Sequence, residues 1–212
     1  MSDIKLVVFD LDGTLVDAFD AVTKSVNYSL EQAGFDVLDH ETIKKKVGWG
    51  ETSLIRSLVA PEEVDKILSI YRIHHKTALK SATRLLPGVK VLLDELKLQG
   101  FKLAIATNRP MRFAHIILKH LKIRDYFHYI LCGDMVKNPK PAGDMLEDIL
   151  AKFDLRAHQA LYVGDMTIDI ETGHAANVKT VAVMTGTHTR EEIEPCEPFK
   201  IVENIADVLK FI

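Results

Sequence analysis

Two aspartates, Asp10 and Asp12, follow directly on the mostly apolar residues 4–9, and Gly13 comes after them. An apolar run rich in Val, Leu, Ile and Phe that ends at Asp and Gly predicts a buried strand stopping at a turn. Parallel sheets carry reactive groups at the carboxyl ends of their strands, so one carboxylate could attack a substrate while the other handles a proton or helps to hold a metal. Like charges this close are unfavourable unless a cation or a proton offsets them, which favours chemistry at this tip.

An Asp-x-Asp-Gly run also occurs in calcium-binding loops and in plain turns. A calcium loop needs oxygen ligands at alternating positions and a Glu at its twelfth residue. The twelfth residue counted from Asp10 is Ala21, which argues against a calcium loop. A plain turn remains the alternative for this segment taken alone.

A second apolar run, residues 101–106, ends at Thr107 and Asn108, and Pro110 opens the next predicted helix. A hydroxyl and free backbone N–H groups beside a helix N-terminus suit phosphate oxygens. Taken alone, however, the pattern favours simple capping of that helix by the same two residues.

Lys140 stands between Pro139 and Pro141. Each proline fixes its own φ and restricts the residue before it, so this lysine has little backbone freedom. Such a setting suits a lysine that must point at a substrate anion. A stiff loop that leads into a helix is the alternative.

Residues 160–164 form a third predicted buried strand, followed by Asp165 and, one helical turn later, by Asp169. This spacing puts both carboxylates on the same side. Gathered with Asp10 and Asp12, they would form an oxygen-rich site suited to Mg²⁺. The alternative is that Asp165 caps a helix and Asp169 lies in its first turn.

In this order, the motifs resemble those of the haloacid dehalogenase-like hydrolase superfamily, and the resemblance covers essentially the whole chain. Within the superfamily, the chain looks most like the phosphoglycolate phosphatase and β-phosphoglucomutase branch, which carries a helical cap between its first and second motifs. The resemblance implies a Mg²⁺-dependent phosphatase acting through an aspartyl-phosphate. Its substrate would be a small phosphorylated metabolite such as 2-phosphoglycolate, a sugar phosphate or pyrophosphate.

The resemblance also implies a role for each motif residue. Asp10 would be the nucleophile and Asp12 the general acid and base. Mg²⁺ would be held by Asp10, Asp165 and the backbone carbonyl of Asp12. Asp169 would support Lys140 or metal-bound water. The residues expected to hold the phosphate oxygens are Thr107, Asn108 and Lys140.

A β-phosphoglucomutase-like isomerase is the alternative function. That branch places a His near the acid, and residues 18–20 lack one. A receiver-type signalling module, in which Asp phosphorylation switches a surface, is a third possibility. Such a module needs no helical cap, so the helical insertion argues against it. An acid at Asp12 argues against the dehalogenases, which lack one, and against the phosphonatases, which usually depart from Asp there.

The elements around these motifs predict an α/β fold. From residue 84 onward, apolar strands alternate with helical stripes, which predicts a Rossmann-like, doubly wound parallel sheet covered on both faces. Residues 16–83 show helical periodicity throughout. We therefore predict a core domain from residues 1–15 and 84–212 with an inserted α-helical cap domain, residues 16–83.

The cap should set specificity. Trp49 and Gly50 lie in a segment that interrupts the helices and could reach into the site, although Trp49 packed beneath a helix corner explains the segment equally well. Arg56 and His75 could meet the distal end of the substrate, or could simply occupy an exposed helix face.

Composition narrows the partners. The 212 residues carry a net charge of −3, and this mild acidity does not recommend a nucleic-acid binder. The apolar run at residues 4–9 is too short for a membrane span or a signal peptide. The two cysteines, Cys132 and Cys196, suggest free thiols in a reducing cytoplasm. We expect a cytoplasmic protein whose partner is a small metabolite, and the oligomeric state stays open.

Overall fold

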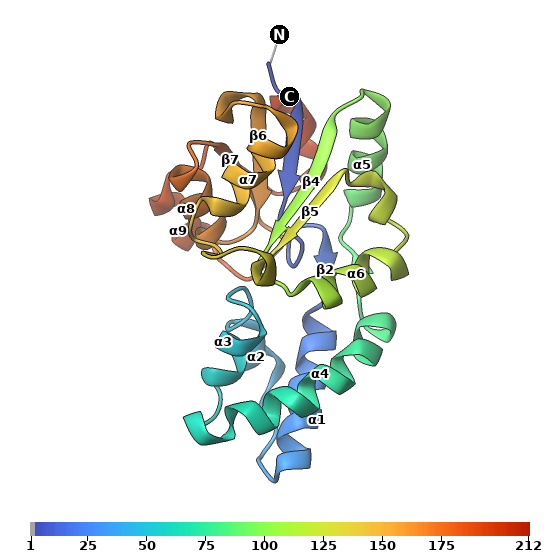
Figure 1. Cartoon of the computed structure of the whole chain (residues 1–212), viewed down its shortest axis with the longest axis vertical. Coiled ribbons are helices and arrows are strands. Elements are labelled where there is room, and N and C mark those ends of the chain that lie inside the picture. Colours follow the sequence, from blue (N-terminus) through green and yellow to red (C-terminus); the bar gives the residue numbers. More distant parts are fainter. Residues whose placement is uncertain (1–2) are drawn as a thin grey trace.

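The computed structural model describes residues 3–212, so the first two residues of the expected segment 1–15 lie outside the described part. It contains a six-stranded sheet in the order β5-β4-β1-β6-β7-β8, and every adjacent pair of strands is parallel (Figure 1). The predicted α/β, doubly wound fold is therefore confirmed. The strands are β1 (Leu6–Phe9), β4 (Lys102–Thr107), β5 (Tyr129–Cys132), β6 (Ala160–Gly164), β7 (Lys179–Val183) and β8 (Lys200–Val202).

Strand β1 lies at the centre of the sheet, and all four of its residues are buried. Its run of apolar side chains suits a strand covered on both faces. Val8 of β1 pairs with Ala104 of β4 on one side and with Tyr162 of β6 on the other. Because these three strands are parallel neighbours, their carboxyl ends lie side by side.

Helices cover both faces of the sheet. Val7 and Phe9 of β1 share one core with residues of several helices, and Leu6 and Val8 share a second core with another helix. The alternation of side chains along the strand thus supplies both cores. The helices that cover the sheet on the side of the first core are α5 (Val89–Leu98) and α6 (Met111–His120), and this core continues into the helices that stand apart from the sheet. The helix of the second core is α7 (Asp144–Phe153), and α8 (Thr167–Ala175) and α9 (Arg190–Ile193) follow β6 and β7.

A helical region stands apart from the sheet in Figure 1 and is called the cap below. The chain enters and leaves it through a two-stranded antiparallel sheet of β2 (Val16–Asp17) and β3 (Arg84–Leu85). The first two residues of the expected cap therefore form a strand. The sequence did not predict it, because a two-residue strand is too short to show a periodic pattern. The cap helices are α1 (Phe19–Ala33), α2 (His40–Lys44), α3 (Glu51–Arg56) and α4 (Val64–Ser81).

The C-terminal segment is a 3-10 helix. The spacing of Ile205, Val208, Leu209 and Ile212 predicts a helical face, and residues Ile205–Phe211 form the 3-10 helix η6. Ile205 and Val208 are buried, and their three-residue spacing matches a helix with three residues per turn. The other 3-10 turns are η1 (Pro61–Glu63), η2 (Arg124–Tyr126), η3 (Gly133–Met135), η4 (Ala157–Gln159) and η5 (Glu194–Cys196).

Within residues 3–212, none of the helices has the length and the apolar character needed to cross a membrane.

Candidate active site

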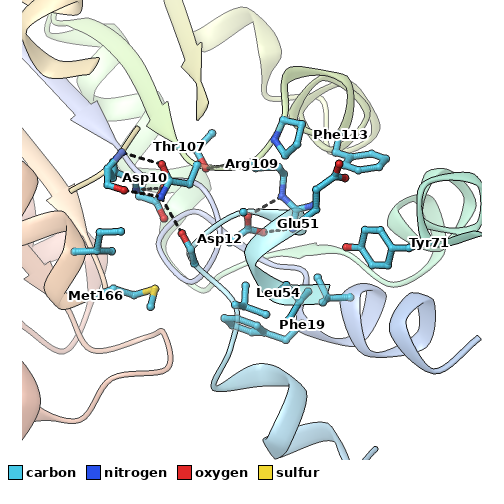
Figure 2. A pocket seen from close by; sticks show the side chains of 18 residues that line it. Asp10, Asp12, Phe19, Glu51, Leu54, Tyr71, Thr107, Arg109, Phe113 and Met166 are labelled. Carbon is cyan, nitrogen blue, oxygen red and sulfur yellow. Dashed lines mark hydrogen bonds and ion pairs between the residues drawn. The ribbon is translucent and has the colours of Figure 1, made fainter. Parts of the chain in front are cut away.

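The carboxyl ends of β1, β4 and β6 bring together motif residues that are far apart in the sequence. Asp10 follows β1, Thr107 ends β4 and Asp165 follows β6. The Asp10 backbone N–H donates to the Val163 carbonyl at 2.8 Å, so the parallel ladder continues up to the aspartate. Figure 2 shows Asp10 and Thr107 side by side at one end of the pocket.

Lys140 is buried among polar groups at this sheet edge. Its Nζ donates to Asp10 Oδ1 at 2.7 Å, to Asp169 Oδ1 at 2.6 Å and to the Tyr162 hydroxyl at 3.1 Å. Burial opposes the charged ammonium, but the Asp10 and Asp169 carboxylates outweigh it and raise the pKa of Lys140 above its ordinary value. The lysine is therefore a fixed positive charge beside Asp10.

Asp169 has both carboxylate oxygens engaged. Its Oδ1 accepts from Lys140 and, at 2.8 Å, from Tyr162, while Oδ2 accepts from the backbone N–H groups of Asp165 at 3.1 Å and Met166 at 3.0 Å. Asp169 thus ties the turn after β6 to Lys140. This set of partners suits a supporting residue better than a direct metal ligand.

Asp165 presents one oxygen that lacks a partner. Its Oδ1 accepts from Thr14 Oγ1 at 2.7 Å, whereas Oδ2 is buried and has no hydrogen bond among the described residues. A Cβ added at Gly13 would lie 2.3 Å from Oδ2, and one added at Gly186 only 1.7 Å from it. The two glycines therefore keep the backbone close to this oxygen, with no side chain to cover it.

These observations fit a hard cation. Oxygens of Asp10, Asp165 and Asp169 all lie within 4.8 Å of one another. Burial raises the pKa of Asp10 to about 7 and that of Asp165 well above its ordinary value. A divalent cation would favour both charged forms and satisfy the orphaned oxygen, and Mg²⁺ prefers such oxygen ligands.

Asp12 is held by an arginine. Arg109 Nε donates to Asp12 Oδ2 at 2.7 Å, and Arg109 Nη2 donates to Asp12 Oδ1 at 2.8 Å, a bidentate pair. The guanidinium is largely buried, with Arg109 only 8% exposed. Figure 2 shows it reaching across the pocket to Asp12.

The sequence interpretation assigned no role to Arg109. One signal was available, because a cation at the start of a helix faces the unfavourable end of the helix dipole. Arg109 stands just before Pro110 and helix α6. A buried arginine in that position needs a specific partner, which Asp12 supplies.

His75 reaches the same arginine from the cap. It is fully buried, and its Nε2 lies 3.0 Å from Arg109 Nη1. An arginine can only donate, so Nε2 accepts and the proton sits on Nδ1, 2.9 Å from Ser25 Oγ. The Ser25 hydroxyl in turn donates to the Ala21 carbonyl at 2.8 Å. Burial first, and Arg109 second, lower the pKa of His75 to about 2, so the ring is neutral.

Asn108 connects three segments. Its amide nitrogen donates to the carbonyls of Gly48 and Lys140, both at 3.2 Å, and its Oδ1 accepts from the Lys140 N–H at 3.0 Å. The side chain therefore ties the cap loop and the lysine loop to the tip of β4. Thr107 Oγ1 accepts from the Arg109 N–H at 3.2 Å, a local turn contact, and Thr107 also lines the cavity.

Of the four residues expected to set cap specificity, two lie at the site and two do not. Gly50 lines the cavity and His75 contacts Arg109. Trp49 is 51% exposed, which fits neither a residue reaching into the site nor one packed beneath a corner. Arg56 is exposed on α3, and neither residue lines the cavity.

Glu51, at the start of α3, is a cap residue that the sequence interpretation missed. It is 8% exposed, and its Oε1 accepts from Arg72 Nε of α4 at 2.7 Å and from Arg112 of core helix α6. The three side chains link the cap to the core. A charged residue among apolar positions of a short helix carries no periodic signal, so only the packing identifies it.

Between cap and core lies a cavity of about 50 Å³. One water needs ~10–15 Å³ on such a measure, so the space suits a small ligand. The polar groups lie at the strand tips and the loops after them, at Arg109 and at Glu51 of the cap, and the remaining walls are largely apolar. Its apolar lining includes Phe19, Leu54, Tyr71, Phe113 and Met166, which Figure 2 labels.

A Rossmann-like sheet with carboxylates and a lysine at its strand tips, closed by a helical cap, is the arrangement of a capped α/β enzyme. The family model of the haloacid dehalogenase-like hydrolases matches residues 7–183, and the chain belongs to this family. The predicted family membership is confirmed.

Similar proteins point to one branch of the family. A phosphoglycolate phosphatase of Mannheimia succiniciproducens is 33% identical in an alignment 222 positions long, which covers 100% of this chain and 99% of that protein. Another, from Pseudomonas fluorescens, is 32% identical over 95% of this chain and 77% of its own length. The crystal structure of a predicted phosphoglycolate phosphatase from Haemophilus somnus has a TM-score of 0.94 at 28% identity, over 99% of this chain and 98% of that one.

Proposed function

We propose that the protein is a Mg²⁺-dependent phosphatase that hydrolyses a small phosphorylated metabolite through an aspartyl-phosphate on Asp10. The family and the phosphoglycolate phosphatases similar to this chain support an enzyme acting on phosphoric monoesters. One observation carries the mechanism. The buried Asp10 contacts the Lys140 ammonium and shares a cluster of carboxylate oxygens with Asp165, whose Oδ2 has no partner.

The reaction would proceed in two steps, phosphoryl transfer to Asp10 and hydrolysis of the aspartyl-phosphate. Asp10 attacks phosphorus, a new bond from its carboxylate oxygen to phosphorus forms, and the bond from phosphorus to the leaving oxygen breaks. Asp12 gives a proton to that oxygen, so an alcohol departs. Water then attacks the aspartyl-phosphate, Asp12 takes its proton back, and inorganic phosphate and free Asp10 result.

The phosphate would be held by groups near Asp10 at the strand tips. Lys140, Thr107 and the backbone N–H of Asn108 would contact its equatorial oxygens, and Asp169 keeps Lys140 in place. Mg²⁺ held by Asp10, Asp165 and the Asp12 carbonyl would offset the charge between an anionic nucleophile and an anionic phosphate.

The cap would close over the substrate and exclude water during transfer. The small, mostly apolar cavity favours a compact metabolite. 2-Phosphoglycolate, a sugar phosphate and pyrophosphate are the candidates. Both cysteines are free thiols, which supports the reducing cytoplasm as its location.

Phosphate release from a panel of phosphoesters, with and without Mg²⁺, tests this proposal. We expect release that requires Mg²⁺, with the best ester defining what the cap prefers. Interconversion of glucose-1-phosphate, assayed in parallel, detects the mutase alternative. Folded protein that releases no phosphate from any ester would contradict the proposal.

A further inference from the structure

We propose that Arg109 recognises a second anionic group on the substrate, exchanging Asp12 for that group as its bidentate partner. The inference rests on the proposed function and narrows its substrate to a short phosphorylated carboxylate, charged at both ends. It makes Arg109 a specificity-determining residue, and it makes His75 the cap residue that positions it.

Arg109 is the cation available at the end of the cavity away from Lys140. Among the described residues that line the cavity, Lys140 and Arg109 carry the positive charges. Lys140 pairs with the buried carboxylates of Asp10 and Asp169, at the end of the cavity where the phosphate would bind. Arg72 and Arg112 do not line the cavity, and both bind Glu51.

The place of Arg109 sets how far its anion can lie from the phosphate. The leaving oxygen must come within hydrogen-bond reach, ~2.6–3.2 Å, of the Asp12 carboxylate if that residue is its proton donor. Arg109 bonds that same carboxylate at 2.7 and 2.8 Å. A carboxylate attached one carbon beyond the leaving oxygen would therefore meet the guanidinium.

The replacement of Asp12 by a substrate carboxylate at Arg109 needs little movement, because both anions have the same shape. A substrate carboxylate offers two coplanar oxygens, as Asp12 does, and can take the same fork of N–H donors. The third contact, from Nη1 to His75, would stay in place. Both Asp12 oxygens would then be free to face the leaving oxygen, so the second anion would promote turnover as well as binding.

His75 suits the positioning task because it is neutral and rigidly held. Its ring accepts from Arg109, is fixed on its other side by Ser25, and stacks on Tyr71 with ring centroids 4.6 Å apart. Since His75 belongs to α4 of the cap and Arg109 to the core, this third contact to the guanidinium forms only when the cap is closed.

The first test uses the wild-type protein and two esters that differ in one group. 2-Phosphoglycolate carries a carboxylate, and carbamoylmethyl phosphate carries a neutral amide of nearly the same shape. We expect kcat/KM for the amide to be about 10- to 100-fold lower, the range expected for loss of a charge-assisted pair. Part of that loss should appear in kcat. Equal kcat/KM values would overturn the inference.

Variants at Arg109 test the residue itself. Arg109→Met should remove most of the preference, because 2-phosphoglycolate loses its partner while the amide loses none. Arg109→Lys keeps the charge without the planar fork and should retain part of the preference. Arg190→Met is the matched control, since Arg190 pairs with exposed Glu194 and Glu203 on the surface, and it should leave the preference intact. A preference unchanged in Arg109→Met would overturn the inference.

The outcomes separate this inference from the proposed function. Hydrolysis of other monoesters but of neither test ester overturns the inference and leaves the phosphatase proposal standing. No hydrolysis of any monoester by folded protein overturns both. If the Arg109 variants do not fold, the wild-type comparison of the two esters still decides.

Discussion

At the core end of the cavity, the side chains of Asp10, Lys140 and Asp169 are 9%, 3% and 1% exposed. At the cap end, the side chain of Glu51 is 7% exposed, but those of its partners Arg72 and Arg112 are 45% and 41% exposed. Buried charges cannot separate without a large desolvation cost, whereas partly exposed pairs part with little loss. The contrast indicates a core end that keeps a fixed geometry for chemistry and a cap end that can release and rebind.

The largest effect should follow from replacing the nucleophile. Asp10→Asn should lower the rate of phosphate release by about four orders of magnitude or more, because the amide cannot form the aspartyl-phosphate. Phosphate release and far-UV circular dichroism would measure activity and folding together. Asp94→Asn, at an exposed carboxylate paired with Lys90, is the control and should keep full activity. A folded Asp10→Asn protein with a tenth of wild-type activity would rule out this role.

Removal of the buried lysine should destabilise the fold as well as the site. Lys140→Met leaves Asp10 and Asp169 buried without their cation, and we expect the free energy of unfolding to drop by about 3–5 kcal/mol. Urea unfolding followed by circular dichroism measures this. A drop below about 1 kcal/mol would mean that the core end is no more rigid than the cap end.

Mg²⁺ should stabilise the core end through Asp165. At a free concentration 100 times the dissociation constant, binding adds about 2.7 kcal/mol to the free energy of unfolding. Asp165→Asn should abolish that gain, and without Mg²⁺ it should be at least as stable as the wild type, because a like charge has left the cluster. Thermal unfolding with Mg²⁺, compared at equal ionic strength with NaCl, checks this. An equal Mg²⁺ shift in both proteins would contradict the site.

The buried His75 should make stability depend on pH. Its pKa is about 2 in the folded protein, against ~6.5 when unfolded, so below pH ~6.5 only the unfolded chain takes up the proton. The contribution of His75 to the free energy of unfolding is therefore complete above pH ~6.5. Below that pH it falls by about 1.4 kcal/mol for each pH unit. His75→Gln should lack this component, and urea titrations of both proteins between pH 7 and 4.5 would reveal it. Parallel pH dependences in the two proteins would place the neutral ring in doubt.

The smallest effect should come from the cap end. Glu51→Gln removes a charge whose two arginine partners can turn to water, so the free energy of unfolding should fall by less than about 1 kcal/mol. A weaker link between α3 and α6 should also raise KM a few-fold with little change in kcat. Steady-state kinetics separates the two parameters. A loss of stability as large as that of Lys140→Met would remove the contrast between the two ends.

The sheet was predictable because its strands are continuous apolar runs. The bounds of β6 agree with the predicted strand at residues 160–164, and those of β1 and β4 differ from the predicted runs by one or two residues. Two short features were not predicted. The pairing of β2 with β3 depends on residues far apart in the sequence, and the 3-10 form of Ile205–Phe211 leaves only a subtle change of spacing.

The site, like the fold, has parts that a local sequence pattern predicts and parts that depend on contacts between distant residues. Asp10, Thr107 and Asp165 could be placed together from sequence, because the ends of neighbouring parallel strands must meet. The pair of Asp12 with Arg109 joins residues 97 positions apart and depends on side-chain direction. The contacts of His75 and Glu51 depend on how the cap docks, which no local pattern records. The predicted roles of the motif residues stay predictions until activity is measured.

The most direct test of the account is to look for the covalent intermediate. Protein mixed rapidly with its best ester and Mg²⁺, quenched in acid and digested, should yield a peptide containing Asp10 that carries one phosphoryl group. Asp10→Asn treated in the same way should carry none. A wild-type protein that turns the ester over while its Asp10 peptide stays unmodified at every quench time would contradict the central claim.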